Sequence, residues 1–182
     1  PNLVVSDINL LNSLPKREII CGYGEILKHS IINSKKTFDY LNKNHNKILR
    51  LKSPFIEKTI AESCKVKRKI IQKDEGEKNL RKTLNLGHTF AHAYEATLSY
   101  SKKLNHGEAV ILGIISATYF SFENNYLNKK DFELIIKHIN KLKIQSDLNT
   151  YFKKKHINLI IKYMKSDKKN ISSNINLILV KR

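Results

Sequence analysis

The chain has 182 residues, enough for one domain with a hydrophobic core, and 41% of them are apolar. Its 34 Lys and Arg residues against 16 Asp and Glu give a formal net charge of +18, which suggests an anionic partner such as nucleic acid, an acidic membrane surface or a small anion. Only five of the basic residues are Arg, the residue favoured for bidentate recognition of phosphates and bases, so the excess of Lys fits a coding bias better than a nucleic-acid interface.

Hydrophobic periodicity predicts helices over most of the chain. A short apolar strand lies within residues 2–11 and ends at a turn-like Ser-Asp pair. The expected helices cover residues 14–32, 34–49, 53–74, 79–98, 108–123, 130–143 and 154–166. A charged loop, SDKKNISS, then leads to a second strand at 174–180. The sequence therefore predicts a mainly α-helical fold with short strands at its two ends.

The helix expected at 53–74 carries a cation on its apolar face. Its apolar stripe runs from Ile56 to Ile71, and Lys67 falls on that stripe where an aliphatic residue would be expected. Burying an ammonium group costs free energy unless it meets a partner. Two interpretations stay open: the side chain reaches out to solvent, or it points into a cleft to meet an anionic substrate.

Several features indicate a cytoplasmic protein without a membrane partner. The two cysteines, Cys21 and Cys64, have no paired spacing, which argues against a disulfide scaffold and fits a reducing compartment. No secretory signal opens the chain. The longest apolar run, at 109–122, is shorter than the roughly 20 residues that span a bilayer, so we interpret it as a buried helix.

Polar side chains of unusual type follow one face of the helix expected at 79–98. Their spacing of four, three, four and three residues places them on a single stripe, which consists of Arg81, Asn85, His88, His92 and Glu95. A solvated face of this chain would be rich in Lys, Asn and Ser. A guanidinium, an amide, two imidazoles and a carboxylate are instead groups that bind anions, metals and protons. The stripe therefore predicts a binding site rather than an ordinary surface.

The two histidines of this stripe raise the possibility of a metal site. Zinc proteases share the His-x-x-x-His spacing, but their catalytic Glu follows the first His, and here Thr89 follows His88. His106, next to the buried helix, and Glu25, in a glycine-containing helix, are further candidate ligands. Three His and carboxylate ligands with one open position are typical of a catalytic metal site. The spacing alone leaves open which imidazoles bind the metal.

Three segments together resemble the 3-dehydroquinate synthase family of sugar-phosphate cyclases. They read PKREIICGYGEILKHSII, KVKRKIIQKDEGEKNLRKTLNLGHTFAHAYE and LNHGEAVILGI, and they occur in the order typical of the family. The resemblance implies one part of a two-domain α/β plus α enzyme. Residues 1–13 would be the junction after an NAD-binding domain, and residues 14–182 would form the helical metal- and substrate-binding domain.

The resemblance also implies a role for each candidate residue. The metal, zinc or cobalt, would be held by Glu25, His88 and His106. The substrate pocket would be lined by Lys28, Lys67, Glu77, Arg81, Asn85, His92 and a Lys from SDKKN, either Lys168 or Lys169. Among these, the catalytic residues would be His92, Lys67 and Asn85. In this scheme His92 lies with Asn85 near the substrate phosphate and does not bind the metal.

The implied reaction converts 3-deoxy-D-arabino-heptulosonate 7-phosphate to 3-dehydroquinate and phosphate, the second step of the shikimate pathway to chorismate and the aromatic amino acids. The enzyme would be a carbon–oxygen lyase that uses NAD and a divalent metal, and a homodimer at full length. No glycine-rich dinucleotide fingerprint occurs in the 182 residues, so we expect them to be inactive alone. Two alternatives remain: another cyclase, such as a 2-deoxy-scyllo-inosose synthase, or a non-catalytic basic helical binding module.

Overall fold

The computed structural model describes residues 3–166 and 174–181, and both Lys168 and Lys169 lie outside these ranges. Seven α-helices are present in the described part: α1 (Lys16–Asn33), α2 (Lys35–Leu49), α3 (Phe55–Lys73), α4 (His88–Thr97), α5 (His106–Glu123), α6 (Lys129–Asn140) and α7 (Ile157–Lys165). Short 3-10 helices are η1 (Ile8–Ser13), η2 (Leu80–Asn85), η3 (Leu148–Thr150) and η4 (Lys154–His156). The prediction of a mainly α-helical fold is confirmed.

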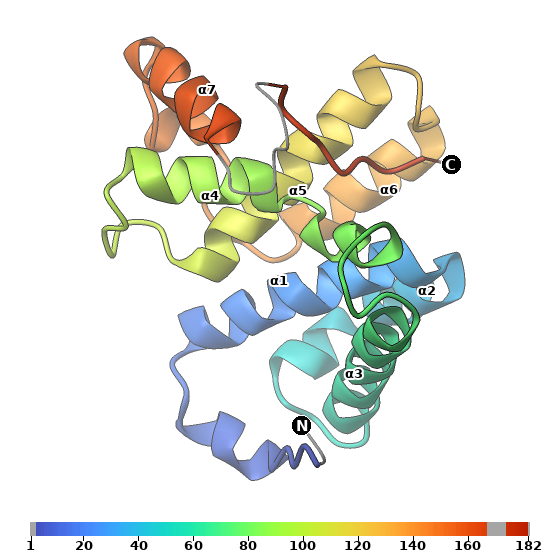
Figure 1. Cartoon of the computed structure of the whole chain (residues 1–182). Coiled ribbons are helices and arrows are strands. Elements are labelled where there is room, and N and C mark those ends of the chain that lie inside the picture. The colour runs from blue at the N-terminus through green and yellow to red at the C-terminus, as the bar shows by residue number, and fades with distance from the viewer. Residues whose placement is uncertain (1–2, 167–173, 182) are drawn as a thin grey trace.

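Helix α5 is the centre of the fold. It packs against α1, α4 and α6, and α1, α2 and α3 form a second group below it (Figure 1). Val110, Ile111 and Leu112 on α5 are fully buried, which confirms that the apolar run is a core helix. Among the described helices, none combines the length and apolar character that a membrane crossing requires.

The strands expected at the two ends do not form in the described residues. Residues 3–7 and 175–181 are extended or irregular, without a strand ladder. Residues 3–7 are exposed and the C-terminal segment packs on helices, whereas a strand needs a neighbouring strand for its backbone hydrogen bonds. The second segment still anchors to the core, because the Val180 N–H donates to Ser121 Oγ at 3.0 Å. The prediction of short strands was therefore wrong.

The helix expected at 79–98 is broken in two. Residues 80–85 form η2, a turn follows, and α4 begins at His88. Gly87 has a φ of 78°, a left-handed conformation that a residue with a side chain rarely adopts, and it ends the first segment. The polar stripe is therefore not one helical face. Arg81 and Asn85 belong to η2, whereas the two histidines and Glu95 belong to α4.

Glycines allow the ligand-bearing helices to approach closely. A Cβ on Gly107 of α5 would collide with the backbone of Cys21 on α1, and one on Gly24 of α1 would lie 2.9 Å from Ile111 Cγ1. A Cβ on Gly87 would lie 2.7 Å from the backbone nitrogen of Ile114, and one on Gly113 would collide with the Gly87 carbonyl. The backbones of α1 and α4 therefore contact α5 directly.

A fully buried histidine joins α6 to α1 and α2. His138 Nδ1 lies 3.0 Å from Asn42 Oδ1, an acceptor, so this nitrogen carries the proton, and His138 Nε2 accepts from the Tyr23 hydroxyl at 3.0 Å. Lys141 Nζ also donates to Asn42 Oδ1, at 2.9 Å. Burial, followed by the charges of His45 and Lys141, lowers the pKa of His138 to about 3. The folded protein therefore keeps this imidazole neutral.

The free energy of unfolding should fall as the pH drops from 7 to 5. The pKa of His138 is about 3 in the folded chain and 6.5 in the unfolded one, so within this window only the unfolded chain binds the proton. The expected loss from His138 between pH 7 and pH 5 is about 2 kcal/mol. Urea unfolding at both pH values should show it. His138→Gln, which does not titrate, should shrink the pH dependence by that amount, and an unchanged dependence would contradict the assignment.

Candidate metal and substrate site

Three candidate ligands from distant parts of the sequence meet at one point. Glu25 comes from the middle of α1, and His88 and His106 are the first residues of α4 and α5. Each offers one ligand atom, and these atoms all lie within 4.8 Å of one another. The glycine contacts of α5 with α1 and α4 place the three elements at this spacing. A carboxylate and two imidazoles at such distances suit a divalent metal such as zinc.

His88 presents an unprotonated nitrogen to this cluster. Its Nδ1 lies 3.3 Å from the Leu86 carbonyl oxygen, an acceptor, so Nδ1 carries the proton and Nε2 carries the lone pair. Nε2 lies 3.5 Å from Glu25 Oε1. Burial first, and then the charge of Lys28, lowers the pKa of His88 to about 4. The imidazole is therefore neutral at pH 7, as metal binding requires.

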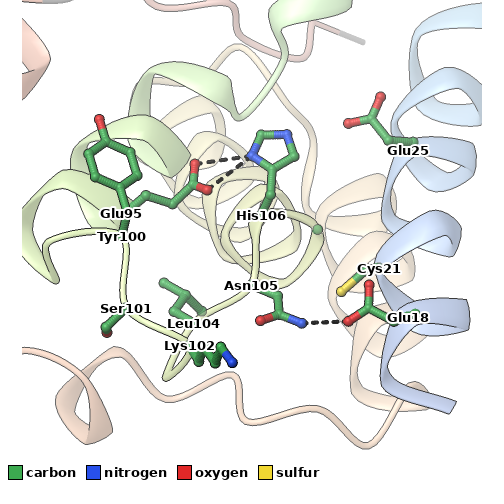
Figure 2. A pocket seen from close by; sticks show the side chains of 11 residues that line it. Glu18, Cys21, Glu25, Glu95, Tyr100, Ser101, Lys102, Leu104, Asn105 and His106 are labelled. Carbon is green, nitrogen blue, oxygen red and sulfur yellow. Dashed lines mark hydrogen bonds and ion pairs between the residues drawn. The ribbon is translucent and has the colours of Figure 1, made fainter. Parts of the chain in front are cut away.

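His106 is oriented by a carboxylate from α4. Its Nδ1 lies 3.0 Å and 3.2 Å from the two carboxylate oxygens of Glu95, and Figure 2 shows this contact. The contact leaves Nε2 for a metal, the arrangement in which a ligating histidine donates its other N–H to a carboxylate. Sequence reasoning assigned Glu95 to the polar stripe but missed this role, because the role depends on the packing of α4 against α5.

Glu25 completes the cluster with one unsatisfied oxygen. Its Oε2 accepts from Lys28 Nζ at 2.7 Å, while its Oε1 is buried and has no hydrogen-bond partner in the described structure. Burial alone would raise the pKa of this carboxyl group, but the charge and hydrogen bond of Lys28 outweigh burial and hold the pKa below its usual value. An ionised oxygen therefore faces the His88 lone pair. Such an arrangement fits a bound cation.

The predicted substrate residues surround the cluster on two sides. The His92 ring lies 5.6 Å from that of His88 and 6.2 Å from that of His106, centroid to centroid. Lys28 is buried, with 3% of its surface exposed. Lys67 is exposed on α3, yet its charge contributes to lowering the pKa of His29, the residue after Lys28. The structure therefore brings His92 and Lys28 to the region of the candidate metal ligands, whereas Lys67 lies on an exposed part of α3.

Three further predicted residues form one cluster in the turn between α3 and α4. Asn85 Nδ2 donates to Glu77 Oε1 at 2.9 Å, and Arg81 Nε lies 3.9 Å from Glu77 Oε2. The Asp74 carboxylate holds the turn, because it accepts from the backbone N–H groups of Lys78, Asn79 and Arg81. These hydrogen bonds, that of Arg81 first, lower the pKa of Asp74. The element η2 also contacts α1 and α3, which carry Lys28 and Lys67.

A cavity of about 530 Å³ opens beside the metal cluster. Glu25, Glu95 and His106 line this cavity, and Figure 2 shows their side chains. Residues without a predicted site role line the rest: Glu18, Cys21, Tyr100, Ser101, Lys102, Leu104, Asn105 and Gly107. Burial raises the pKa of the Cys21 thiol, which makes the thiol a poor nucleophile at neutral pH.

Comparison with known proteins identifies the family to which the chain belongs. A family model described as "3-dehydroquinate synthase C-terminal" matches residues 22–170, which include all three candidate ligands and all the predicted substrate residues. The chain belongs to this family. The resemblance seen in its sequence motifs is therefore confirmed.

Curated members of the 3-dehydroquinate synthase family match the chain along nearly its whole length. It is 60% identical over 182 residues to the 3-dehydroquinate synthase of Pelagibacter ubique (strain HTCC1062), covering 100% of this chain and 50% of that protein. It is 40% identical over 179 residues to the enzyme of Thermoanaerobacter sp. (strain X514), covering 98% of this chain and 49% of that protein. The chain thus spans about half the length of these relatives.

A solved structure supports the fold. The chain resembles ValA, a 2-epi-5-epi-valiolone synthase from Streptomyces hygroscopicus subsp. jinggangensis 5008 that was solved with NAD+ and Zn2+ bound, with a TM-score of 0.75 and 18% sequence identity. The match covers 86% of this chain and 42% of that one. It shows that the 3-dehydroquinate synthase half and the cyclase share their helical architecture. The roles of the individual site residues stay predictions.

Proposed function

We propose that this chain is the metal- and substrate-binding half of a cytoplasmic, homodimeric 3-dehydroquinate synthase. The complete enzyme would convert 3-deoxy-D-arabino-heptulosonate 7-phosphate to 3-dehydroquinate and phosphate, as a carbon–oxygen lyase of the shikimate pathway. The observation that carries this proposal is the convergence of Glu25, His88 and His106, with an unsatisfied carboxylate oxygen facing an imidazole lone pair beside Lys28. Family membership and the names of the relatives support the same function.

Zinc or cobalt would be held by Glu25, His88 and His106. Bound there, the metal supplies Lewis-acid chemistry that lowers the pKa of a coordinated substrate hydroxyl group. Glu95 fixes the ring of His106, and the Leu86 carbonyl fixes that of His88. The protein thereby keeps both imidazoles in the tautomer that leaves Nε2 for the metal.

The cations around the cluster suit the charges of the proposed substrate. The heptulosonate phosphate carries a phosphate and a carboxylate, and Lys28, Lys67 and Arg81 present two ammonium groups and a guanidinium. His92 and Asn85 would contact the phosphate, where an imidazole can hold or release a proton as the phosphate leaves. Glu77 orients both Asn85 and Arg81 through the contacts described above.

NAD would be bound largely by the half of the relatives that this chain does not span. The cyclase structure with NAD+ and Zn2+ bound supports a pairing of both groups in one enzyme of this architecture. The same structure keeps one alternative open, a cyclase that acts on a different sugar phosphate. The cation set favours the heptulosonate, because a sugar phosphate without a carboxylate has one anionic group fewer for these residues to bind.

A complete protein that contains this chain should release phosphate from 3-deoxy-D-arabino-heptulosonate 7-phosphate in the presence of NAD. Chelation of the metal should abolish turnover, because the substrate hydroxyl group then lacks the Lewis acid that lowers its pKa. Added zinc or cobalt should restore turnover. Phosphate release and 3-dehydroquinate formation provide the measurement. The 182-residue chain alone should release none. Turnover of other hexose or heptulose phosphates, with none of the heptulosonate, would instead identify a different cyclase.

A further inference from the structure

One guanidinium joins the start of α1 to the start of α5. Arg17 Nε donates to Glu108 Oε1 at 2.7 Å, and Arg17 Nη2 donates to Glu108 Oε2 at 2.6 Å, so the pair is bidentate. The Glu108 side chain is 15% exposed, so this ion pair is less accessible to solvent than the pairs Lys35–Asp39 and Lys65–Glu62, in which both side chains are exposed. The two residues are 91 positions apart in the sequence. The contact therefore fixes tertiary rather than local structure.

The same guanidinium holds the loop that leads into α5. Arg17 Nη1 donates to the Lys102 carbonyl at 3.1 Å, and Arg17 Nη2 donates to the Lys103 carbonyl at 3.2 Å. The loop begins with Ser99 and Tyr100, which both have a φ of 53°, an uncommon backbone conformation for residues with side chains. Arg17 thus holds the end of this loop through two hydrogen bonds to its carbonyl groups and two to Glu108 in the first turn of α5.

Glu108 passes this restraint on to the first turn of α5. Its Oε2 accepts from the Asn105 N–H at 2.9 Å, the reciprocal contact of a capping box. The Asn105 side chain in turn donates to Glu18 Oε1 at 2.8 Å, a bond drawn in Figure 2. Arg17 and Glu18 therefore hold the cap of α5 from both sides. His106 and Gly107 are the two residues between this cap and Glu108.

Packing does little to place His106. Its side chain is 54% exposed, whereas that of His88 is only 13% exposed. A core histidine keeps its place through its neighbours, whereas a half-exposed one depends on its backbone and on polar contacts such as the one between His106 and Glu95. The backbone of His106 is set by the capped helix start. We define the Arg17 clamp as Arg17, Glu108 and the four hydrogen bonds that the Arg17 guanidinium donates. The clamp holds the helix start that carries His106.

We propose that the Arg17 clamp is a positioning device for the metal ligand His106. It fixes the start of α5 relative to α1, and α1 also carries Glu25, so the clamp sets the distance between two of the three ligands. The inference rests on the proposed metal site. Neither Arg17 nor Glu108 touches the cluster, and both act only through the position of His106 and its helix.

Zinc titration of the chain against a chromophoric chelator tests this inference. Arg17→Met should weaken zinc affinity by about 10-fold, the lower end of the effect of losing a residue that hydrogen-bonds directly to a metal ligand, because Arg17 acts on His106 only through the helix start. The absorption bands of bound Co2+, which report coordination geometry, should shift as well. Lys35→Met is the matched control: it removes the cation of an exposed ion pair on α2, far from α5 in the sequence, and should leave zinc affinity unchanged.

A double-mutant cycle separates positioning from a general loss of stability. In a His106→Ala background, the two remaining ligands should bind zinc only weakly and lose it on dialysis, but titration at high zinc concentration still measures this affinity. Arg17→Met should not weaken it further, because the ligand that Arg17 positions is gone. A full additional loss there would overturn the inference. If Arg17→Met does not fold, Arg17→Lys replaces it, since Lys keeps the charge against Glu108 but cannot make four hydrogen bonds in a planar fork.

The outcomes distinguish this inference from the proposed function. Wild-type zinc affinity and an unchanged cobalt spectrum in folded Arg17→Met would overturn the clamp's role while leaving the metal site intact. A wild-type chain that binds no zinc would overturn the proposed metal site and the inference together. Weakened binding in Arg17→Met that Glu108→Gln reproduces supports both, because Gln keeps an acceptor for Asn105 but loses the charge that Arg17 pairs with.

Discussion

Glu25→Ala and His106→Ala are each expected to abolish stoichiometric zinc binding to the folded chain. Each variant removes one of the three groups whose ligand atoms lie within 4.8 Å of one another, and two remaining ligands hold zinc far more weakly than three. The loss should be the largest effect of any single substitution at this site. Metal analysis after dialysis, supported by zinc titration of each purified variant, provides the measurement.

His92→Ala is the matched control for this prediction. His92 lies on the same helix as His88, with the two rings 5.6 Å apart, but it does not belong to the three-residue cluster. The variant should keep its zinc and lose affinity for a phosphate-containing substrate analogue. If His92→Ala strips the metal while His106→Ala retains it, the proposed roles of the two imidazoles are reversed.

Gly113→Ala and Gly107→Ala are expected to destabilise the fold by about 3 kcal/mol or more. The new methyl group would collide with the Gly87 carbonyl in the first variant and with the Cys21 backbone in the second. Neither obstacle is the end of a flexible side chain, so the helices themselves must move apart. Equilibrium unfolding in urea, followed by circular dichroism at 222 nm, measures the loss.

Gly22→Ala supplies the opposite case within α1. This glycine is exposed, and a Cβ there would meet no atom within 4 Å. Since Ala has a higher helix propensity than Gly, the substitution should stabilise the protein by about 0.5–1 kcal/mol. Stabilisation by all three substitutions would show that helix propensity outweighs close backbone contact at Gly107 and Gly113.

The sequence predicted the first three helices well because their signals are local. Ser34 accepts a hydrogen bond from the Thr37 N–H and so begins α2 where the cap predicts, and α1 and α3 end within one residue of their expected bounds. The prediction of one helix at 79–98 was wrong because the backbone turns at Gly87. The polar residues keep their spacing of four and three on both sides of this turn, so the spacing did not reveal it. The predicted stripe therefore corresponds to residues of two elements, η2 and α4, and their roles stay predictions.

The parts of the site that sequence could not supply depend on contacts between distant elements. The roles of Glu95 toward His106 and of Arg17 toward Glu108 follow from how α4 and α1 lie against α5. Periodicity describes one helix at a time and carries no information on such pairings. The candidate ligands themselves were accessible, through residue type and family resemblance. The two terminal strands were wrong for the same reason, because strand formation depends on a neighbour.

The positions of the candidate ligands in the sequence imply that metal binding follows the packing of the helices. Glu25, His88 and His106 are provided by three separate helices, and no two of them share one. A nascent or partly folded chain therefore has no local segment that holds the ion, in contrast to a zinc finger, whose ligands are close in sequence. Metal binding at the proposed site would therefore require that α1, α4 and α5 have packed, so an occupied site would indicate that the tertiary structure is complete.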